Sequence, residues 1–81
     1  MKRSFAQKHG FKIMGTLRSF AAVGVEPEIM GIGPAAAIPV ALEKAGITTA
    51  DVGVYEINEA FASQAAYCVA KLGLNPDVRW G

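Results

Sequence analysis

Two strand-like apolar runs separated by a helix constrain the fold more than any other feature of this sequence. The first run extends from Ile13 to Val25, and the second is the shorter segment from Val52 to Ile57. A strand–helix–strand crossover places its two strands in parallel through a right-handed connection. Parallel sheets are covered on both faces, so two strands alone do not complete a core. The sequence therefore predicts an incomplete α/β unit, strand–helix–strand–helix, with parallel strands.

Glycines mark the expected ends of three helices. Residues 2–9 read as the end of a short helix that stops at Gly10, and residues 34–45 form a helix before Gly46. A third helix stops at Gly73. A glycine just after a helix favours the left-handed conformation that ends it. We expect residues 1–10 to belong to an element preceding the α/β unit.

The composition suits a buried setting better than a lone small domain. A chain of 81 residues buries only about 60% of its unfolded surface, yet 52% of these residues are hydrophobic and 19% are charged.

The net charge of +1 gives no electrostatic argument for binding nucleic acid. One cysteine and one histidine exclude an internal disulfide and disfavour a zinc site. No apolar run approaches the roughly 20 residues of a membrane span. We expect no metal, no nucleic acid and no membrane span, in a soluble, reducing compartment.

The basic residues are unevenly distributed. Five of the eight precede the first acidic residue, Glu26. A basic, acid-free N-terminus can mimic a mitochondrial transit peptide, but this stretch is poor in serine and leads directly into a strand-like run. A solvated helix face is the favoured interpretation.

Two strand-to-helix turns are candidate ligand sites, because such sites form beyond the carboxyl ends of strands in open α/β sheets. The first turn, residues 26–34, contains Gly31-x-Gly33. A dinucleotide-binding fingerprint needs a third glycine where Ala36 stands, and no Lys-Ser/Thr pair follows to make a P-loop. A tight turn is favoured over a nucleotide site here.

The second turn, residues 57–61, contains Asn58 and Glu59. The Asn58 carbonyl oxygen is expected to cap the third helix, while its amide NH₂ is left to face a substrate or water. Glu59 is either a base or a carboxylate that complements the helix dipole. From these residues alone, simple capping is the favoured interpretation.

Three other reactive residue types have weaker arguments. Cys68 lies on an apolar stripe with Phe61, Ala65 and Leu72, which favours a buried structural thiol over a nucleophile. His9 is expected to be exposed at a helix end, with nothing nearby to orient it as a base. Ser63 lacks a partner histidine.

The segment around Asn58 closely resembles a signature of the thiolases: Glu56-Ile57-Asn58-Glu59-Ala60-Phe61-Ala62-Ser63-Gln64. A second thiolase-like motif lies upstream at the expected separation: Val23-Gly24-Val25-x-Pro27-x-x-Met30-Gly31-x-Gly33-Pro34. The resemblance covers roughly residues 1–77 and is greatest to the peroxisomal 3-ketoacyl-CoA branch of the family. It implies a partial thiolase-like fold, an incomplete C-terminal domain.

The resemblance implies an acyltransferase of fatty acid β-oxidation that cleaves 3-ketoacyl-CoA to acetyl-CoA and a shortened acyl-CoA. The position of Asn58 holds a water that forms an oxyanion hole with a histidine from a Gly-His-Pro motif. Met30, Ala60 and Phe61 match positions along the pantetheine and acyl pocket. CoA and acyl-CoA are substrates, and no cofactor is expected. Family members are dimers or tetramers, and the peroxisome is the implied location, with mitochondria or cytosol as alternatives.

The departures from the family limit the expected activity. Neither the nucleophilic cysteine segment nor the C-terminal Cys-x-Gly is present, and Cys68 matches neither catalytic cysteine. Residues 78–81 diverge from the family and look like a foreign tail. We expect the chain alone to be inactive. The alternatives are a non-catalytic module that binds intact thiolase subunits and an independent CoA- or nucleotide-binding domain.

Overall fold

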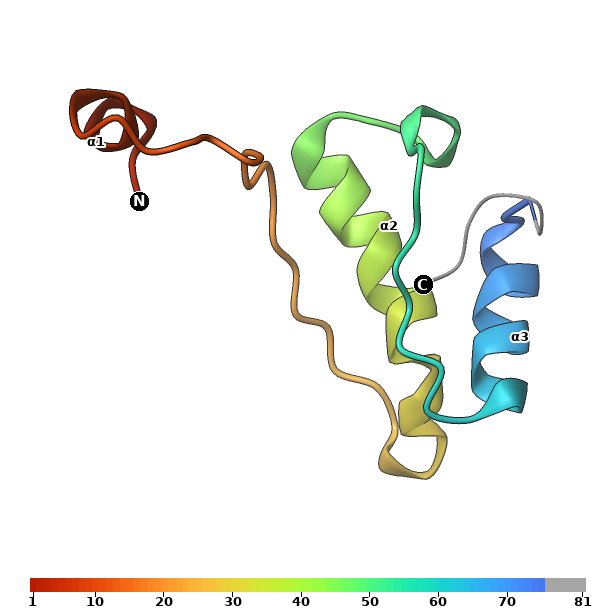
Figure 1. Ribbon diagram of the computed structural model, residues 1–81. Coiled ribbons are helices and arrows are strands. Elements are labelled where there is room, and N and C mark those ends of the chain that lie inside the picture. Colours follow the sequence, from red (N-terminus) through yellow and green to blue (C-terminus); the bar gives the residue numbers. More distant parts are fainter. Residues whose placement is uncertain (76–81) are drawn as a thin grey trace.

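The computed structural model describes residues 1–75, which form a helical pair joined by a long connection to a separate short helix (Figure 1). In chain order the elements are α1 (Arg3–Lys8), the 3₁₀ helix η1 (Pro27–Ile32), α2 (Gly33–Ala45), the 3₁₀ helix η2 (Thr49–Asp51) and α3 (Ala62–Leu72). Helices α2 and α3 lie side by side, whereas α1 lies at the far end of the connection (Figure 1). Residues 78–81, which the sequence predicts to be a divergent tail, lie outside the described residues.

The predicted glycine stops are confirmed. Gly46 and Gly73 follow α2 and α3 with φ of 71° and 62°, and Gly10 follows the first helix with φ of 66°. At Gly73, the backbone N–H donates to the carbonyl of Ala70 at 3.2 Å. Only glycine reaches this left-handed region without a steric penalty, so these residues fix where each helix ends.

The expected capping of the third helix by Asn58 is wrong. Helix α3 begins at Ala62, four residues later, and Phe61 precedes it with extended φ and ψ of −140° and 138°. The first helical bond joins the N–H of Ala65 to the carbonyl of Phe61 at 3.1 Å. The reason is spatial, because Ile57 is held in the core and the chain must extend from there to the position of α3 before it can become helical. Residues 58–61 form this extension, which we call the crossing segment.

The expected strand pairing is not formed within residues 1–75, where Tyr55 alone occupies a bridge position. Among these residues, the segment from 12 to 25 makes no backbone–backbone hydrogen bond. Side chains hold it against α2 instead. Ser19 Oγ donates to the carbonyl of Ala41 at 2.7 Å, and Lys44 Nζ donates to the carbonyl of Phe20 at 3.2 Å. The parallel pairing stays a prediction.

The core is small and lies between α2 and α3. Tyr55, Ile57 and Leu74 are buried together, and partly buried apolar side chains pack around them: Ile38, Val52, Val69 and Leu72. The segment from residue 52 to 61 runs beside α2 on its way to α3 (Figure 1). Tyr55 and Ile57 therefore hold α2 and α3 together, because both side chains pack between the two helices.

Much of the apolar surface is uncovered. The accessible surface is 6470 Å², whereas a compact protein of this mass has about 4,700 Å². The radius of gyration is 15.4 Å, against roughly 12 Å for a compact domain of this length. Large apolar side chains such as Met14 and Leu17 are 92% and 87% exposed. The chain thus contains many more hydrophobic residues than this fold buries.

A capping box at η2 makes its stability depend on pH. The backbone N–H and the Oγ1–H of Thr48 donate to Asp51 Oδ2 at 2.8 and 3.0 Å. Chiefly the backbone bond, and then the side-chain bond, lower the pKa of Asp51 from its usual value of 3.8. A lowered folded-state pKa means that the bonds stabilise the turn above pH 3.8 and are lost as pH falls through the lowered value.

We expect a carboxyl ¹³C NMR titration of Asp51 to have its midpoint below 3.8, because the charged form accepts both hydrogen bonds. The same titration in denaturant supplies the matched control and should return the ordinary value. Equal midpoints in the two conditions would contradict the capping box.

Candidate functional site

Asn58 lies on the crossing segment at the rim of an open cavity of about 430 Å³. The cavity is lined by Ile57, Asn58, Glu59, Ala62, Ala65, Ala66 and Val69. Asn58 and Glu59 are exposed, and the small side chains of α3 form the apolar wall. Within residues 1–75, the Asn58 side chain has no hydrogen-bond partner, so its amide is available to a water or a ligand.

Because α3 begins at Ala62, the Asn58 carbonyl oxygen is not engaged in capping. Both ends of the Asn58 amide, and not the NH₂ group alone, are therefore left to face a substrate or water. An exposed amide offers two donors and an acceptor. Glu59 lies on the same rim, three residues before the helix, and supplies the only carboxylate lining this cavity.

Phe61 lines a second, more open groove of about 300 Å³ between η1 and the start of α3. The groove is lined by Ile29, Gly31, Ile32, Phe61, Ser63, Gln64 and Tyr67. Met30 projects from η1 with 76% of its surface exposed, and Phe61 is 72% exposed. The structure thus brings η1 and Phe61 together, whereas Asn58 opens onto the other cavity.

Cys68 is fully buried, which confirms the structural interpretation. Its Sγ–H donates a weak hydrogen bond to the carbonyl of Gly31 at 3.8 Å. Ala65 and Leu72, on the same stripe, are half-buried, while Phe61 is exposed because it precedes the helix. A nucleophile must reach its substrate, and this thiol lies beneath η1 instead.

His9 is exposed, as predicted, and it lies in an aromatic cluster that was not predicted. Its ring stacks on Phe5 with centroids 4.1 Å apart, and the ring of Phe11 lies 6.0 Å away on a near-parallel plane. The Nδ1–H of His9 donates to the carbonyl of Phe5 at 3.0 Å. The i, i+4 spacing of Phe5, in α1, and His9, its C-cap residue, was the available signal.

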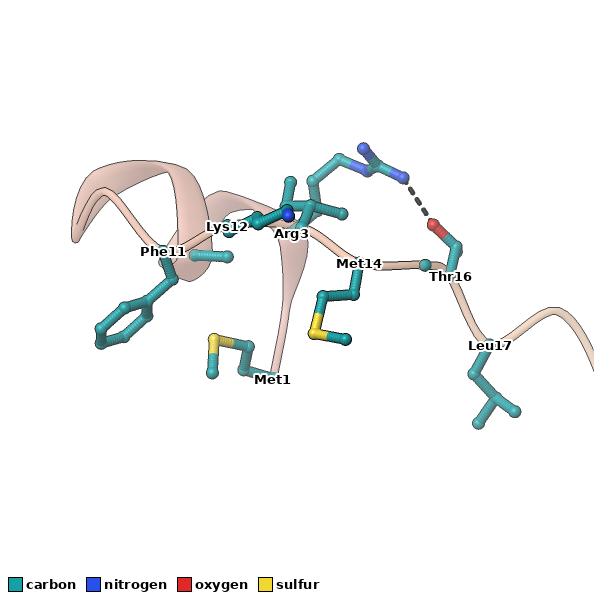
Figure 2. Close-up of a pocket in the computed structure, with 10 residues that line it drawn as sticks. Met1, Arg3, Phe11, Lys12, Met14, Thr16 and Leu17 are labelled. Carbon is teal, nitrogen blue, oxygen red and sulfur yellow. Dashed lines mark hydrogen bonds between the residues drawn. The ribbon is translucent and has the colours of Figure 1, made fainter.

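A further cavity of about 430 Å³ lies between α1 and residues 11–17 and was not predicted (Figure 2). Arg3 Nη2 donates to Thr16 Oγ1 at 2.6 Å, and Met1 and Met14 contribute apolar surface. Ten residues line the cavity, and none is a carboxylate, cysteine or histidine. It offers apolar contact and the positive charges of Arg3 and Lys12.

Within residues 1–75, no group of three or more His, Cys, Asp or Glu side chains is placed to hold a metal ion. In the same part of the chain, no helix has both the length and the hydropathy needed to cross a membrane.

Comparison with known proteins identifies relatives of most of this chain. Residues 11–78 match the family model for the C-terminal domain of thiolase. Human peroxisomal 3-ketoacyl-CoA thiolase is 67% identical over 76 residues, which cover 94% of this chain and 18% of the human protein. A peroxisomal 3-ketoacyl-CoA thiolase of Petunia hybrida is 61% identical over 77 residues, covering 95% and 17%.

Solved structures give the same result. The dimeric peroxisomal thiolase of Saccharomyces cerevisiae superposes with a TM-score of 0.91 at 49% identity, over 94% of this chain and 19% of that one. Human mitochondrial 3-ketoacyl-CoA thiolase superposes with a TM-score of 0.92 at 36% identity, over 95% and 20%. A second structure of the yeast enzyme is described as five-layered, α-β-α-β-α. The chain spans about a fifth of the length of these relatives.

The burial of Cys68 predicts that its thiol is inert in the folded chain. We expect Ellman's reagent to label it at least about tenfold more slowly in native buffer than in denaturant, because the reagent must reach a sulfur that is fully buried. Free cysteine added to the same native buffer controls for the reagent. Equal labelling rates in buffer and denaturant would contradict the packing of α3 against η1.

Proposed function

This chain belongs to the thiolase family, within its C-terminal domain, and we propose that it supplies part of the active site of a peroxisomal 3-ketoacyl-CoA thiolase. In the proposed reaction, CoA cleaves a 3-ketoacyl-CoA between its α and β carbons. Acetyl-CoA leaves, and the thiol sulfur of CoA bonds to the shortened acyl group. The names of the human and yeast relatives support this substrate class and the peroxisomal location.

The observation that carries the proposal is the unengaged amide of Asn58 at the cavity rim. In the proposed role, this amide holds a water that donates to the negative oxygen developing on the thioester. Donors fixed in place before the reaction stabilise such an oxyanion without reorganising, and loss of one typically costs about 10²–10³ in rate. An exposed crossing segment, anchored by buried Ile57 on one side and α3 on the other, suits that positioning.

Met30, Ala60 and Phe61 are proposed to line the pantetheine arm and acyl chain. Met30 and Phe61 are largely exposed apolar side chains on neighbouring elements. Binding pockets for such ligands are mostly apolar with a few placed polar groups, and methionine adapts its shape to flexible ligands. Ala60, also exposed, offers little bulk between Asn58 and Phe61.

The remaining catalytic groups are proposed to come from family segments that residues 1–81 do not contain. The single cysteine is buried, and the sequence holds no Gly-His-Pro. By this proposal, residues 13–25 and 52–57 supply parallel strands to a β layer of the kind described for the yeast enzyme. The completed enzyme is proposed to be a homo-oligomer, as the dimeric yeast relative is.

The uncovered apolar surface supports a second candidate, a non-catalytic module that binds thiolase subunits. Ile13, Leu17 and Phe20 are exposed along a segment without backbone pairing in residues 1–75. An open strand edge with apolar side chains is a template for pairing with another chain. This candidate would be favoured if the chain co-purified with an intact thiolase, and if the thiolase activity of that complex were the same with Asn58 as with Asn58→Ala.

The purified 81-residue chain is expected to show no thiolysis of acetoacetyl-CoA or longer 3-ketoacyl-CoA, because its single cysteine is buried and the family's catalytic cysteine segments are absent from residues 1–81. The measurement is the loss of 3-ketoacyl-CoA absorbance with CoA present, with a complete thiolase as the positive control. Measurable turnover by the chain itself would contradict the proposed division of the active site.

The role of Asn58 is testable in human peroxisomal thiolase whose 76 matched residues are replaced by those of this chain. We expect Asn58→Ala to lower kcat by about 10²-fold or more, with little change in melting temperature, because an exposed oxyanion donor is lost. Glu56→Gln, an exposed neighbour that lines neither cavity, is the matched control and should retain kcat. An unchanged kcat in Asn58→Ala would remove Asn58 from the mechanism.

A further inference from the structure

The backbone of η1 lies directly against α3 at one point, Gly31. A Cβ placed on Gly31 would lie 2.9 Å from Cγ and 3.2 Å from Cβ of Gln64. One turn further along α3, the thiol of Cys68 reaches the carbonyl of the same glycine. Since the absence of a side chain permits this approach, Gly31 determines how closely η1 packs on the helix.

Gln64 meets Gly31 through the aliphatic part of its side chain. Its Oε1 is shielded from solvent and has no hydrogen-bond partner within residues 1–75. A shielded amide oxygen without a donor opposes folding, so a hydrogen bond to this oxygen does not explain the position of Gln64. The Cβ and Cγ atoms instead fill the space opposite Gly31.

The contact joins η1, which carries Met30, to α3, which Phe61 directly precedes. Met30 directly precedes Gly31 on η1, and Phe61 lies three residues before Gln64 at the start of α3. Gly31, Gln64 and Phe61 line the same groove. Met30 does not line that groove but directly precedes Gly31 in η1, so we expect a change in the distance between Gly31 and Gln64 to change the distance between Met30 and Phe61.

We propose that Gly31 and Gln64 are positioning residues that set the separation of Met30 and Phe61, and so the fit of the acyl-CoA substrate. This inference rests on the proposed function. It assigns the two residues no contact with the reacting atoms. Their effect is therefore on substrate binding, seen in KM, more than on the oxyanion chemistry of Asn58, seen in kcat.

The test uses the same human chimera, with purified 3-ketoacyl-CoA as substrate. Gly31→Ala is expected to raise KM about fivefold or more while kcat changes by less than about threefold, because binding is lost without loss of the oxyanion donor. Gly31→Ala combined with Gln64→Ala removes the clashing Cγ and is expected to return KM to within about threefold of the parent. A KM for the double variant equal to or above that of Gly31→Ala overturns the proposal.

Gln64→Met provides the matched control, since it keeps Cβ and Cγ and removes the amide. We expect a KM near that of the parent for Gln64→Met and a raised KM for Gln64→Ala alone. Equal increases in both variants would show that the amide, and not the aliphatic part, is responsible, which overturns the proposal. If Gly31→Ala does not fold, the comparison of KM between Gln64→Met and Gln64→Ala still tests the proposal.

Melting temperatures separate this inference from the proposed function. If the parent chimera folds but catalyses no thiolysis, the proposed function fails. The contact itself is then tested by whether Gln64→Ala recovers the melting temperature lost in Gly31→Ala. Recovery of melting temperature together with unchanged KM values in an active chimera would leave a structural contact only, and would overturn the positioning role.

Discussion

The burial of Tyr55 and Ile57 between α2 and α3 is the interaction on which the rest of the structure depends. Both side chains belong to one short segment, so their burial fixes the chain that connects the helices. That anchoring leaves residues 58–61 as a crossing segment and delays the start of α3 to Ala62. The availability of the Asn58 amide is thus a consequence of packing several residues upstream. Local helix propensity at Asn58 does not decide it.

Features governed by local chemistry were predictable from the sequence. The helix ends at Gly46 and Gly73 follow from the left-handed conformation that glycine adopts easily. The buried state of Cys68 follows from its place on an apolar stripe. The thiolase resemblance, carried by two motifs at matching separation, is confirmed by the family match over residues 11–78. These predictions needed no knowledge of distant contacts.

Features governed by distant contacts were not predictable in the same way. Asn58 has the chemistry of a helix cap, but Ile57 is held in the core and prevents the helix from starting there. The strand-like run from residue 13 to 25 has the right composition, but pairing requires a neighbouring strand that residues 1–75 do not supply. The approach of Gly31 to Gln64 joins residues 33 positions apart and has no local signature. Roles for Met30, Ala60 and Phe61 rest on the family resemblance.

The hydrogen bonds from Ser19 and Lys44 hold the segment before η1 beside α2 without help from a sheet. They span 22 and 24 residues, and the Cys68–Gly31 bond spans 37. Within residues 1–75, Ser19 and Phe20 are placed by these bonds and not by a backbone ladder. A strand supplied by another part of a thiolase would therefore meet a segment that already lies along α2, and its register would have to match the two positions that these side chains fix.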